Sequence, residues 1–400
     1  MARSLLCFFC QKKLSTVFFA LAFFNIANSQ NPIVTENALA GTPKSTWDIS
    51  GAGDLSIQGF ATDISVNKGT TVRFKIETEP VASFTITIYR LGYYQGNGAR
   101  LITSLGTFSG TDQPDGSYNA STGLLNCANW SESASWAVPV TAVSGLYLAK
   151  LTKTSGGGSS HIPFIVRDDA STAPILLKTS DNTWQAYNPY GGNSLYVGST
   201  SYPNGHAAKV SLNRPYITRA GGGGGGPGQD WYMNAEYPMI KFLERNGYNI
   251  AYTTDVDLDR SATPITPANH KLIISSGHDE YWSLAERNKI EAARDAGVHL
   301  AFFSGNEVYW KVRWENNFRT LVCYKEGTLG ENVCGNKCDP TSAWTGLWRD
   351  GAAWDAGKPE NNLTGQISWS DVSSAITVTG AYKNLWFWRG TGVAGLAANG

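Results

Sequence analysis

The sequence predicts a two-part chain: an all-β, immunoglobulin-like sandwich over residues 30–169, followed by an α/β domain with a mainly parallel sheet over residues 173–400. Two observations predict this division. Up to about residue 166, short runs of alternating apolar and polar residues are separated by Gly, Asn, Asp and Ser clusters. After residue 172, compact apolar runs alternate with longer segments of helical periodicity. The first pattern is typical of antiparallel strands, and the second of strands joined by helices.

In the first part, clear strand candidates cover residues 71–76, 84–89 and 145–151. Because apolar and polar side chains alternate, each strand would have one buried face and one wet face, as in a sandwich of two sheets. No catalytic constellation stands out in this part, and we expect it to support or shield its neighbour. Aromatic residues there leave carbohydrate binding open as a weaker alternative: Tyr93, Tyr94 and Trp130.

In the second part, compact apolar segments predict strands at residues 174–178, 249–254, 271–275 and 299–303. Helical patterns cover residues 234–246 and 283–296, and each stops at a glycine suited to a helix C-terminus, Gly247 and Gly297. Strand, helix and strand at this spacing predict a parallel sheet. The carboxyl ends of parallel strands form the ligand crevice in such domains, so we expect the functional loops there.

Composition limits the class of protein. The 400 residues with 42% hydrophobic content can form cores for two ordinary domains. The 32 basic and 32 acidic residues balance, and no block of Lys or Arg marks a nucleic-acid surface. The 43 glycines and 16 prolines indicate many turns and short strands.

The N-terminus resembles a cleavable signal peptide over residues 1–29. Basic residues at Arg3, Lys12 and Lys13 precede an apolar run over residues 14–27, and we expect cleavage after Ser29. A membrane anchor is the alternative, but the run is shorter than the roughly 20 residues that a spanning helix needs. We therefore expect a secreted or periplasmic protein with no membrane span in the mature chain.

Cleavage would remove two of the six cysteines and leave Cys127, Cys323, Cys334 and Cys338. An even number in an exported chain suggests disulfides. The segment from Cys334 to Cys338 lacks the spacing of a zinc site, and its Gly and Asn suit a small stapled loop. We prefer a disulfide in this loop, although three pairings remain open.

Three loops at predicted strand ends offer polar side chains to one crevice: residues 183–196, 277–282 and 304–311. No Gly-x-Ser-x-Gly motif occurs in this domain, which disfavours a serine nucleophile. Ser283 and Glu286 form a capping box at the start of a helix, so Ser283 has a structural role. What remains is a set of oxygen donors and one histidine, which suits an oxygen-loving metal.

These loops carry a family resemblance. The segments WQAYN (184–188), SLY (194–196), TDVDL (254–258), GHDEYW (277–282) and FSGNE (303–307) resemble the C-terminal domain family of the N,N-dimethylformamidase large subunit. The likeness spans about residues 174–388. It implies a fold related to class I glutamine amidotransferases and a mononuclear Fe3+ held by two tyrosines and one glutamate. Carried over by position, these ligands are Tyr187, Tyr196 and Glu280, with Tyr190 as a nearby alternative to Tyr196.

The resemblance also implies that His278 and Asn306 lie near the iron or contact substrate, and both are catalytic candidates. Glu307 is a third candidate, either as a base or as a partner of Arg313. Asp255 and Asp257 are more simply explained as residues that cap the turn after their strand.

The resulting functional hypothesis is a secreted, iron-dependent hydrolase acting on the C–N bond of a small amide. The known enzyme pairs its large subunit with a small one that is not evident here, and a homo-oligomer is possible. The chain stops at Gly400, where relatives continue, so a truncated product or absent activity is expected. The alternative is a non-catalytic secreted or surface protein that binds carbohydrate or peptide on the same fold.

Overall fold

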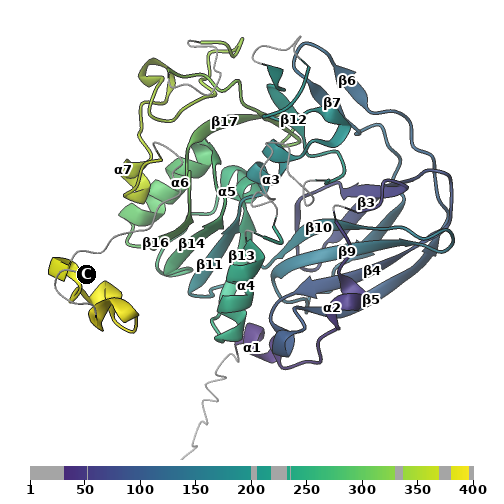
Figure 1. Ribbon diagram of the computed structural model, residues 1–400, viewed down its shortest axis with the longest axis horizontal. Helices are drawn as coiled ribbons and strands as arrows, with labels where there is room; N and C mark the ends of the chain where they lie inside the picture. Colours follow the sequence, from purple (N-terminus) through teal and green to yellow (C-terminus); the bar gives the residue numbers. More distant parts are fainter. Residues whose placement is uncertain are drawn as a thin grey trace, which may run out of the picture.

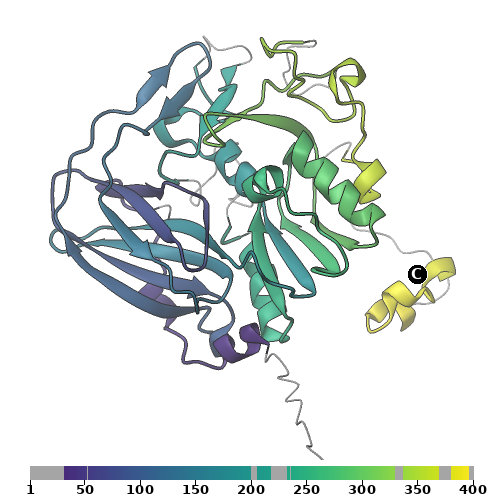
Figure 2. The same ribbon diagram turned by 180° about the vertical axis from the view of Figure 1, so that it is seen from behind.

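The computed structural model describes residues 31–51, 53–199, 205–217, 232–234, 236–328, 337–368 and 380–395. The predicted signal peptide and Cys334 lie outside these residues. The described residues form two β-rich halves that lie side by side, as Figure 1 shows from the front and Figure 2 from behind. The predicted boundary at residues 169–173 falls in the segment that joins the two halves.

The N-terminal half contains the short helical segments α1 (Pro32–Asn37), α2 (Lys44–Trp47) and η1 (Tyr94–Gly96). Its strands are β1 (Ile57–Ala61), β2 (Ser65–Asn67), β3 (Thr71–Thr78), β4 (Phe84–Leu91), β5 (Ala99–Phe108), β6 (Ser117–Asn119), β7 (Leu124–Asn126), β8 (Ala134–Ala137), β9 (Gly145–Lys153) and β10 (Ser159–Arg167). Hydrogen bonds join β1, β3 and β8 into one sheet, and β2, β10, β9, β4 and β5 into another. Strands β6 and β7 form a separate hairpin.

A hydrophobic core fills the space between these two sheets. Every second residue of β3 is buried, and Phe74 of this sheet packs edge-on against Phe164 of the other. This alternation follows from the period of two in a pleated strand. The strands predicted at residues 71–76, 84–89 and 145–151 are confirmed as parts of β3, β4 and β9.

The strands of the C-terminal half are β11 (Ile175–Thr179), β12 (Lys209–Ser211), β13 (Ile250–Thr254), β14 (Leu272–Gly277), β15 (Tyr281–Ser283), β16 (His299–Ser304), β17 (Trp310–Glu315) and β18 (Thr320–Val322). Its helical segments are α3 (Asp181–Tyr187), η2 (Tyr190–Gly192), α4 (Glu236–Arg245), α5 (Asp255–Arg260), α6 (Leu284–Asp295), η4 (Ala352–Trp354), α7 (Asn361–Thr364), η5 (Gly380–Tyr382), η6 (Trp386–Trp388) and η7 (Gly392–Gly395). The four predicted strands correspond to β11, β13, β14 and β16, which form a parallel sheet in the order β13, β11, β14, β16.

The two predicted helices are confirmed as α4 and α6. Ser283 caps α6, and its side chain and that of Glu286 make the reciprocal hydrogen bonds of a capping box. Both helices are followed by a glycine in the left-handed region, Gly247 with φ 71° and Gly297 with φ 97°. A side chain at either position would strain the backbone, which explains why the sequence marks these helix ends so clearly.

The predicted fold class is wrong. The C-terminal half is not one mainly parallel, glutamine amidotransferase-like α/β layer, because β12, β18, β17 and β15 form a second, mixed sheet. The described part of the chain is mostly β, in antiparallel and mixed sheets besides the four-stranded parallel one, and of its helices only α4 and α6 have ten or more residues. Three strands of the mixed sheet are only three residues long. A strand of three residues is too short to show a period in the sequence. It forms by pairing with a segment that lies far away along the chain.

The two halves share one hydrophobic core, which includes Leu146 and Ile165 from the first half and Leu177 and Ile240 from the second. A fully buried ion pair also joins them: Arg90 Nη2 of β4 lies 2.7 Å from Glu244 Oε1 of α4. No helix in the described ranges is long and apolar enough to cross a membrane.

Candidate functional site

The loops after β11, β14 and β16 meet at one edge of the parallel sheet. Because the strands are parallel, their carboxyl ends lie together, as the sequence predicted. Figure 1 shows α3 and α5, which follow β11 and β13, at the same end of this sheet. The mixed sheet packs beside this edge, since β15 directly follows the loop that carries Glu280.

Glu280 is the centre of the site. Its carboxylate is buried and accepts hydrogen bonds at 2.9 Å from the hydroxyls of both Tyr187 and Tyr196. Trp310 Nε1 donates a further hydrogen bond of 3.0 Å to Oε1. The Glu280 backbone N–H donates to Thr183 Oγ1 on α3. The structure therefore brings the three predicted ligands together, and side chains from α3, from the loop after η2 and from β17 hold the carboxylate.

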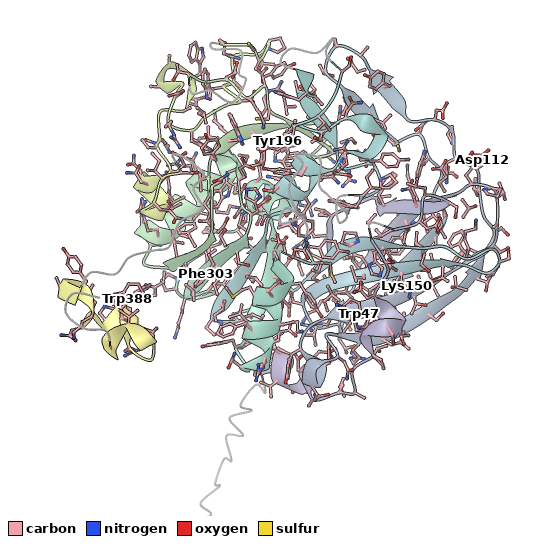
Figure 3. All side chains as sticks on the ribbon, in the orientation of Figure 1. Trp47, Asp112, Lys150, Tyr196, Phe303 and Trp388 are labelled. Atoms are coloured by element: carbon pink, nitrogen blue, oxygen red, sulfur yellow. The ribbon has the colours of Figure 1, made fainter. Side chains whose placement is uncertain are left out.

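The two tyrosine rings are held by further contacts. Tyr187 and Tyr196 stack with centroids 4.1 Å apart, and the Tyr281 hydroxyl donates a 2.6 Å hydrogen bond to that of Tyr196. Lys325 Nζ lies 3.3 Å from the centroid of the Tyr196 ring and 4.9 Å from that of Trp310. Figure 3 labels Tyr196, which lies between α3 and the mixed sheet.

Tyr281 and Trp310 lie in the predicted loops at residues 277–282 and 304–311 but were not among the candidate site residues, and neither was Lys325. Tyr281 and Trp310 could have been found from the sequence, because Tyr281 directly follows Glu280 and Trp310 lies in the loop at residues 304–311. Lys325 follows a three-residue strand with no motif around it, so nothing in the sequence marked it.

The environment of the tyrosines opposes ionisation in the absence of a cation. Burial, and next the negative charge of Glu280, raises the pKa of Tyr196 well above its usual range. The same two causes raise the pKa of Tyr281. A cation between these groups would reverse the effect, because it favours the ionised phenol.

His278 and Asn306 lie at the rim. His278 Nε2 is 3.5 Å from Glu280 Oε2, and its ring packs against Tyr187 with centroids 5.4 Å apart. Asn306 is half-buried, has a left-handed backbone with φ 52°, and accepts a hydrogen bond from Ser368 Oγ. The structure thus brings His278 to the carboxylate, whereas the side chain of Asn306 is hydrogen-bonded to a different segment.

Glu307 lies behind the site in a buried layer, where its Oε1 is 3.0 Å from Ser275 Oγ. The predicted pairing of Glu307 with Arg313 is wrong, because Arg313 pairs with Glu315 and Asp339. The catalytic role predicted for Glu307 stays a prediction.

A second buried feature in this layer escaped the sequence analysis. Lys178, at the end of β11, forms ion pairs with Asp255, Asp279 and Glu286. Although burial acts in the opposite direction, the carboxylates of Asp255 and Asp279 hold the pKa of Lys178 well above its usual value. The sequence did contain a signal for this cluster, because a lysine that is buried in an otherwise apolar parallel strand needs an acidic partner.

Asp255 and Asp257 occupy the first turn of α5, which begins directly after β13 with Thr254 as its N-cap. Asp257 also pairs with Arg167 and Arg260 at the seam between the halves. The cap itself is Thr254, so the predicted capping role of the two aspartates is wrong, whereas their position in the turn after the strand is confirmed.

The structure describes three of the four cysteines expected in the mature chain, Cys127, Cys323 and Cys338. Cys338 is disulfide-bonded, whereas Cys127 and Cys323 are buried free thiols. Pairings that join Cys127 or Cys323 to another cysteine are therefore wrong. Buried free thiols pack as small hydrophobic side chains.

The aromatic residues considered for carbohydrate binding are mostly internal. Tyr94 and Trp130 are 0% and 3% exposed and belong to the packing of the N-terminal half. Their proposed role as exposed stacking platforms is wrong. Tyr190, the alternative to Tyr196, packs against the cluster that contains Cys127 and Trp130.

The donor set around Glu280 fits a single cation. Two oxygens that bind one metal at about 2.0–2.2 Å and at right angles, as in octahedral coordination, lie roughly 2.8–3.1 Å apart. The tyrosine and Glu280 oxygens are 2.9 Å apart. Among the described residues, no group of three or more His, Cys, Asp or Glu side chains could hold a metal. The group at Glu280 is of another kind, because two of its three donors are phenolic.

Known proteins with similar sequences support the resemblance noted above. The family model "N,N-dimethylformamidase beta subunit-like, C-terminal" matches residues 85–400. The N,N-dimethylformamidase beta subunit of Alcaligenes sp is 23% identical over 221 residues, which cover 47% of this chain and 28% of that protein. This chain therefore matches little more than a quarter of that relative's length.

Two solved structures also show a likeness, a chimeric tandem of titin Z1Z2 domains and the titin Z1Z2 domains in complex with telethonin. They are 21% and 17% identical and cover 28% and 31% of this chain, and 52% and 58% of theirs. Both TM-scores are 0.15, so neither supports a statement about the fold. The family match, in contrast, covers well over half of the sequence and includes every residue of the site described above. The chain belongs to the N,N-dimethylformamidase beta subunit-like, C-terminal family.

Proposed function

We propose that this chain hydrolyses the C–N bond of a small amide, and that Tyr187, Tyr196 and Glu280 hold the Fe3+ on which the reaction depends. The observation that carries the proposal is the convergence of the three side chains, with both tyrosine hydroxyls 2.9 Å from one buried carboxylate. Family membership supports amide hydrolysis, because the relative that matches is named a dimethylformamidase.

The proposed chemistry adds water across the amide, so that the hydroxyl joins the carbonyl carbon, the proton joins nitrogen, and the C–N bond breaks. When bound, Fe3+ supplies Lewis acidity toward the carbonyl oxygen and water. The protein contributes orientation: Tyr281 fixes the hydroxyl of Tyr196, and Trp310 fixes the carboxylate of Glu280. His278, 3.5 Å from Glu280, is placed to hold or move a proton.

Iron content and visible absorption of the purified protein test the metal part of the proposal. We expect about one iron per chain and a coloured protein with a tyrosinate-to-iron charge-transfer band. Tyr187→Phe and Glu280→Gln should lose both, because each removes a donor. Tyr190→Phe is the matched control, since it removes a phenol that packs in the N-terminal cluster. Full iron content and an unchanged band in the Glu280 variant would refute the ligand assignment.

Release of amine from N,N-dimethylformamide tests the activity. Iron-loaded protein should release dimethylamine, and Glu280→Gln should reduce the rate at least about 100-fold, the scale of losing transition-state stabilisation of roughly 3 kcal/mol. Protein that is fully loaded with iron but hydrolyses neither this amide nor other small amides would refute the proposed hydrolase activity. It would not contradict the proposed metal site.

The proposal also includes three further points: export of the chain, a small amide as the substrate, and assembly of the chain with itself or with another subunit. The relative is named a beta subunit, which motivates the last point. N-terminal sequencing of protein secreted by an expression host tests export, with Gln30 as the expected first residue. An intact Met1 in the exported fraction would contradict cleavage after Ser29.

A further inference from the structure

A line of buried polar groups runs behind Glu280 and includes Glu307, Ser275, Asp279 and Lys178. Ser275 Oγ lies 3.0 Å from Glu307 Oε1 and 2.5 Å from Asp279 Oδ2. Both Asp279 oxygens are 2.7 Å from Lys178 Nζ. All four residues are at most 3% exposed, so the line is shielded from water.

The geometry of Ser275 favours an extra proton on one of its two carboxyl neighbours. Two carboxyl groups lie within hydrogen-bonding distance of one serine hydroxyl, which has a single hydrogen to donate. If Ser275 donates to Asp279, the contact with Glu307 is favourable only when Glu307 donates to Ser275. Asp279 is the better acceptor of the two, because it also faces the ammonium of Lys178.

The charges around Glu307 agree with a neutral acid. Lys178 is the cation that faces it, and this lysine already pairs with Asp279, Asp255 and Glu286. Glu307 Oε2 is buried and has no hydrogen-bond partner among the described residues, which suits a carbonyl oxygen far better than half of an ionised carboxylate. Burial, and next the charge of Asp279, raises the pKa of Glu307 to about 9.

The segment that carries Glu307 also holds the backbone of the site. The N–H of Val308 donates to the carbonyl of Asp279, and those of Tyr309 and Trp310 donate to the carbonyl of Glu280. Val308 has φ 55°, a left-handed conformation that is strained for a β-branched residue. Surrounding contacts must therefore fix this segment, and the bond from Glu307 to Ser275 is one of them.

We propose that Glu307 is a positioning residue that carries a proton at neutral pH and donates it as a hydrogen bond to Ser275, which fixes Asp279 and thereby the loop that presents Glu280. Its role for the iron site rests on the function proposed above, whereas its protonation does not. A general base at this position would need an ionised carboxylate, so the two roles exclude each other.

Infrared spectroscopy of the full chain at pH 7 tests the protonation. The carbonyl-stretch band of protonated carboxyl groups should lose intensity in Glu307→Gln. Glu315→Gln is the matched control, because Glu315 is ion-paired with Lys209 and Arg313 and should leave the band unchanged. No loss of intensity in the Glu307 variant would overturn the proposal.

Two substitutions of Glu307 test positioning. Glutamine keeps a hydrogen-bond donor and should retain the iron affinity, charge-transfer band and hydrolysis, whereas alanine should lower iron affinity about 10-fold to 100-fold, as for other groups that orient metal ligands. Equal loss in both variants would show that the carboxylate itself is needed, and equal retention would show that the bond is dispensable. Either result overturns the proposal.

One further measurement separates this inference from the proposed function. Near-ultraviolet circular dichroism reports on the same geometry in protein without iron, when the signal of the stacked Tyr187 and Tyr196 rings is taken as the part that Tyr187→Phe removes. The signal should be unchanged by glutamine and altered by alanine at position 307. If the unsubstituted chain binds no iron, the proposed function fails, and this signal and the infrared band still decide the role of Glu307.

Discussion

Replacing Glu307 by glutamine should change how the stability of the protein depends on pH. In the folded chain the pKa of Glu307 is about 9, mainly because of burial, against a usual value of 4.5. The folded state therefore binds a proton that the unfolded state has already released at neutral pH. Stability contributed by such a group is complete below pH 4.5 and is lost as the pH rises toward 9.

The size of the effect follows from the two pKa values. Each pH unit between them costs about 1.4 kcal/mol of unfolding free energy, so the loss between pH 5 and pH 8 is about 4 kcal/mol. Glutamine does not titrate and has nearly the same shape. The difference in stability between Glu307→Gln and the unsubstituted protein should therefore grow by about this amount over the same interval.

Urea unfolding at pH 5, 6, 7 and 8, followed by tryptophan fluorescence, measures this difference directly. Other buried acids, such as Glu236 with a pKa raised by burial to about 7, affect both proteins equally and cancel. A difference that stays constant from pH 5 to pH 8 would show that Glu307 is ionised in the folded state, and the reasoning from burial would be refuted.

Two further predictions concern other parts of the chain. Arg90→Met should lower the unfolding free energy by about 3–5 kcal/mol, because it leaves the buried charge of Glu244 unpaired. Arg73→Met breaks an exposed ion pair and should lower it by less than about 1 kcal/mol. Equal losses of the two variants in urea unfolding would contradict this prediction. Lys325→Met should move the charge-transfer band of iron-loaded protein to longer wavelength, because the ammonium over the Tyr196 ring stabilises the electrons of the phenolate, and an unmoved band would count against this contact.

The local elements of the second half could be predicted because their signals are local. The α6 helix shows both a capping box at Ser283 and a left-handed glycine at Gly297, and each acts within one turn of the helix. Three strands of the parallel sheet are apolar runs buried on both faces, such as Ile250–Thr254, in which every residue is buried, whereas the edge strand β16 is partly exposed. Pattern and structure agree wherever neighbours in the sequence decide the conformation.

The mixed sheet could not be predicted in this way. Lys209–Ser211 pairs with Thr320–Val322 across more than a hundred residues, and strands of three residues contain too few positions to show alternation. The fold class was wrong because the sequence pattern covered only the parallel part of the second half.

The candidate site was predictable where the family motifs lie and nowhere else. Tyr187, Tyr196 and Glu280 come from motif loops, and the structure brings their oxygens together. Lys178 and Lys325 are charged residues whose partners lie far away in the sequence, so their contacts follow from the completed fold. The protonation of Glu307 likewise follows from its burial in the completed fold, and no local pattern of residues reveals it.

The central claim is that two phenolic oxygens and one carboxylate hold a single iron, and anomalous diffraction at the iron absorption edge tests it most directly. Crystals of iron-loaded protein should show one peak within about 2.0–2.2 Å of Tyr187 Oη, Tyr196 Oη and a Glu280 carboxylate oxygen. A peak among the carboxylates around Lys178, or a fully loaded protein with no peak between the two tyrosines, would contradict the account.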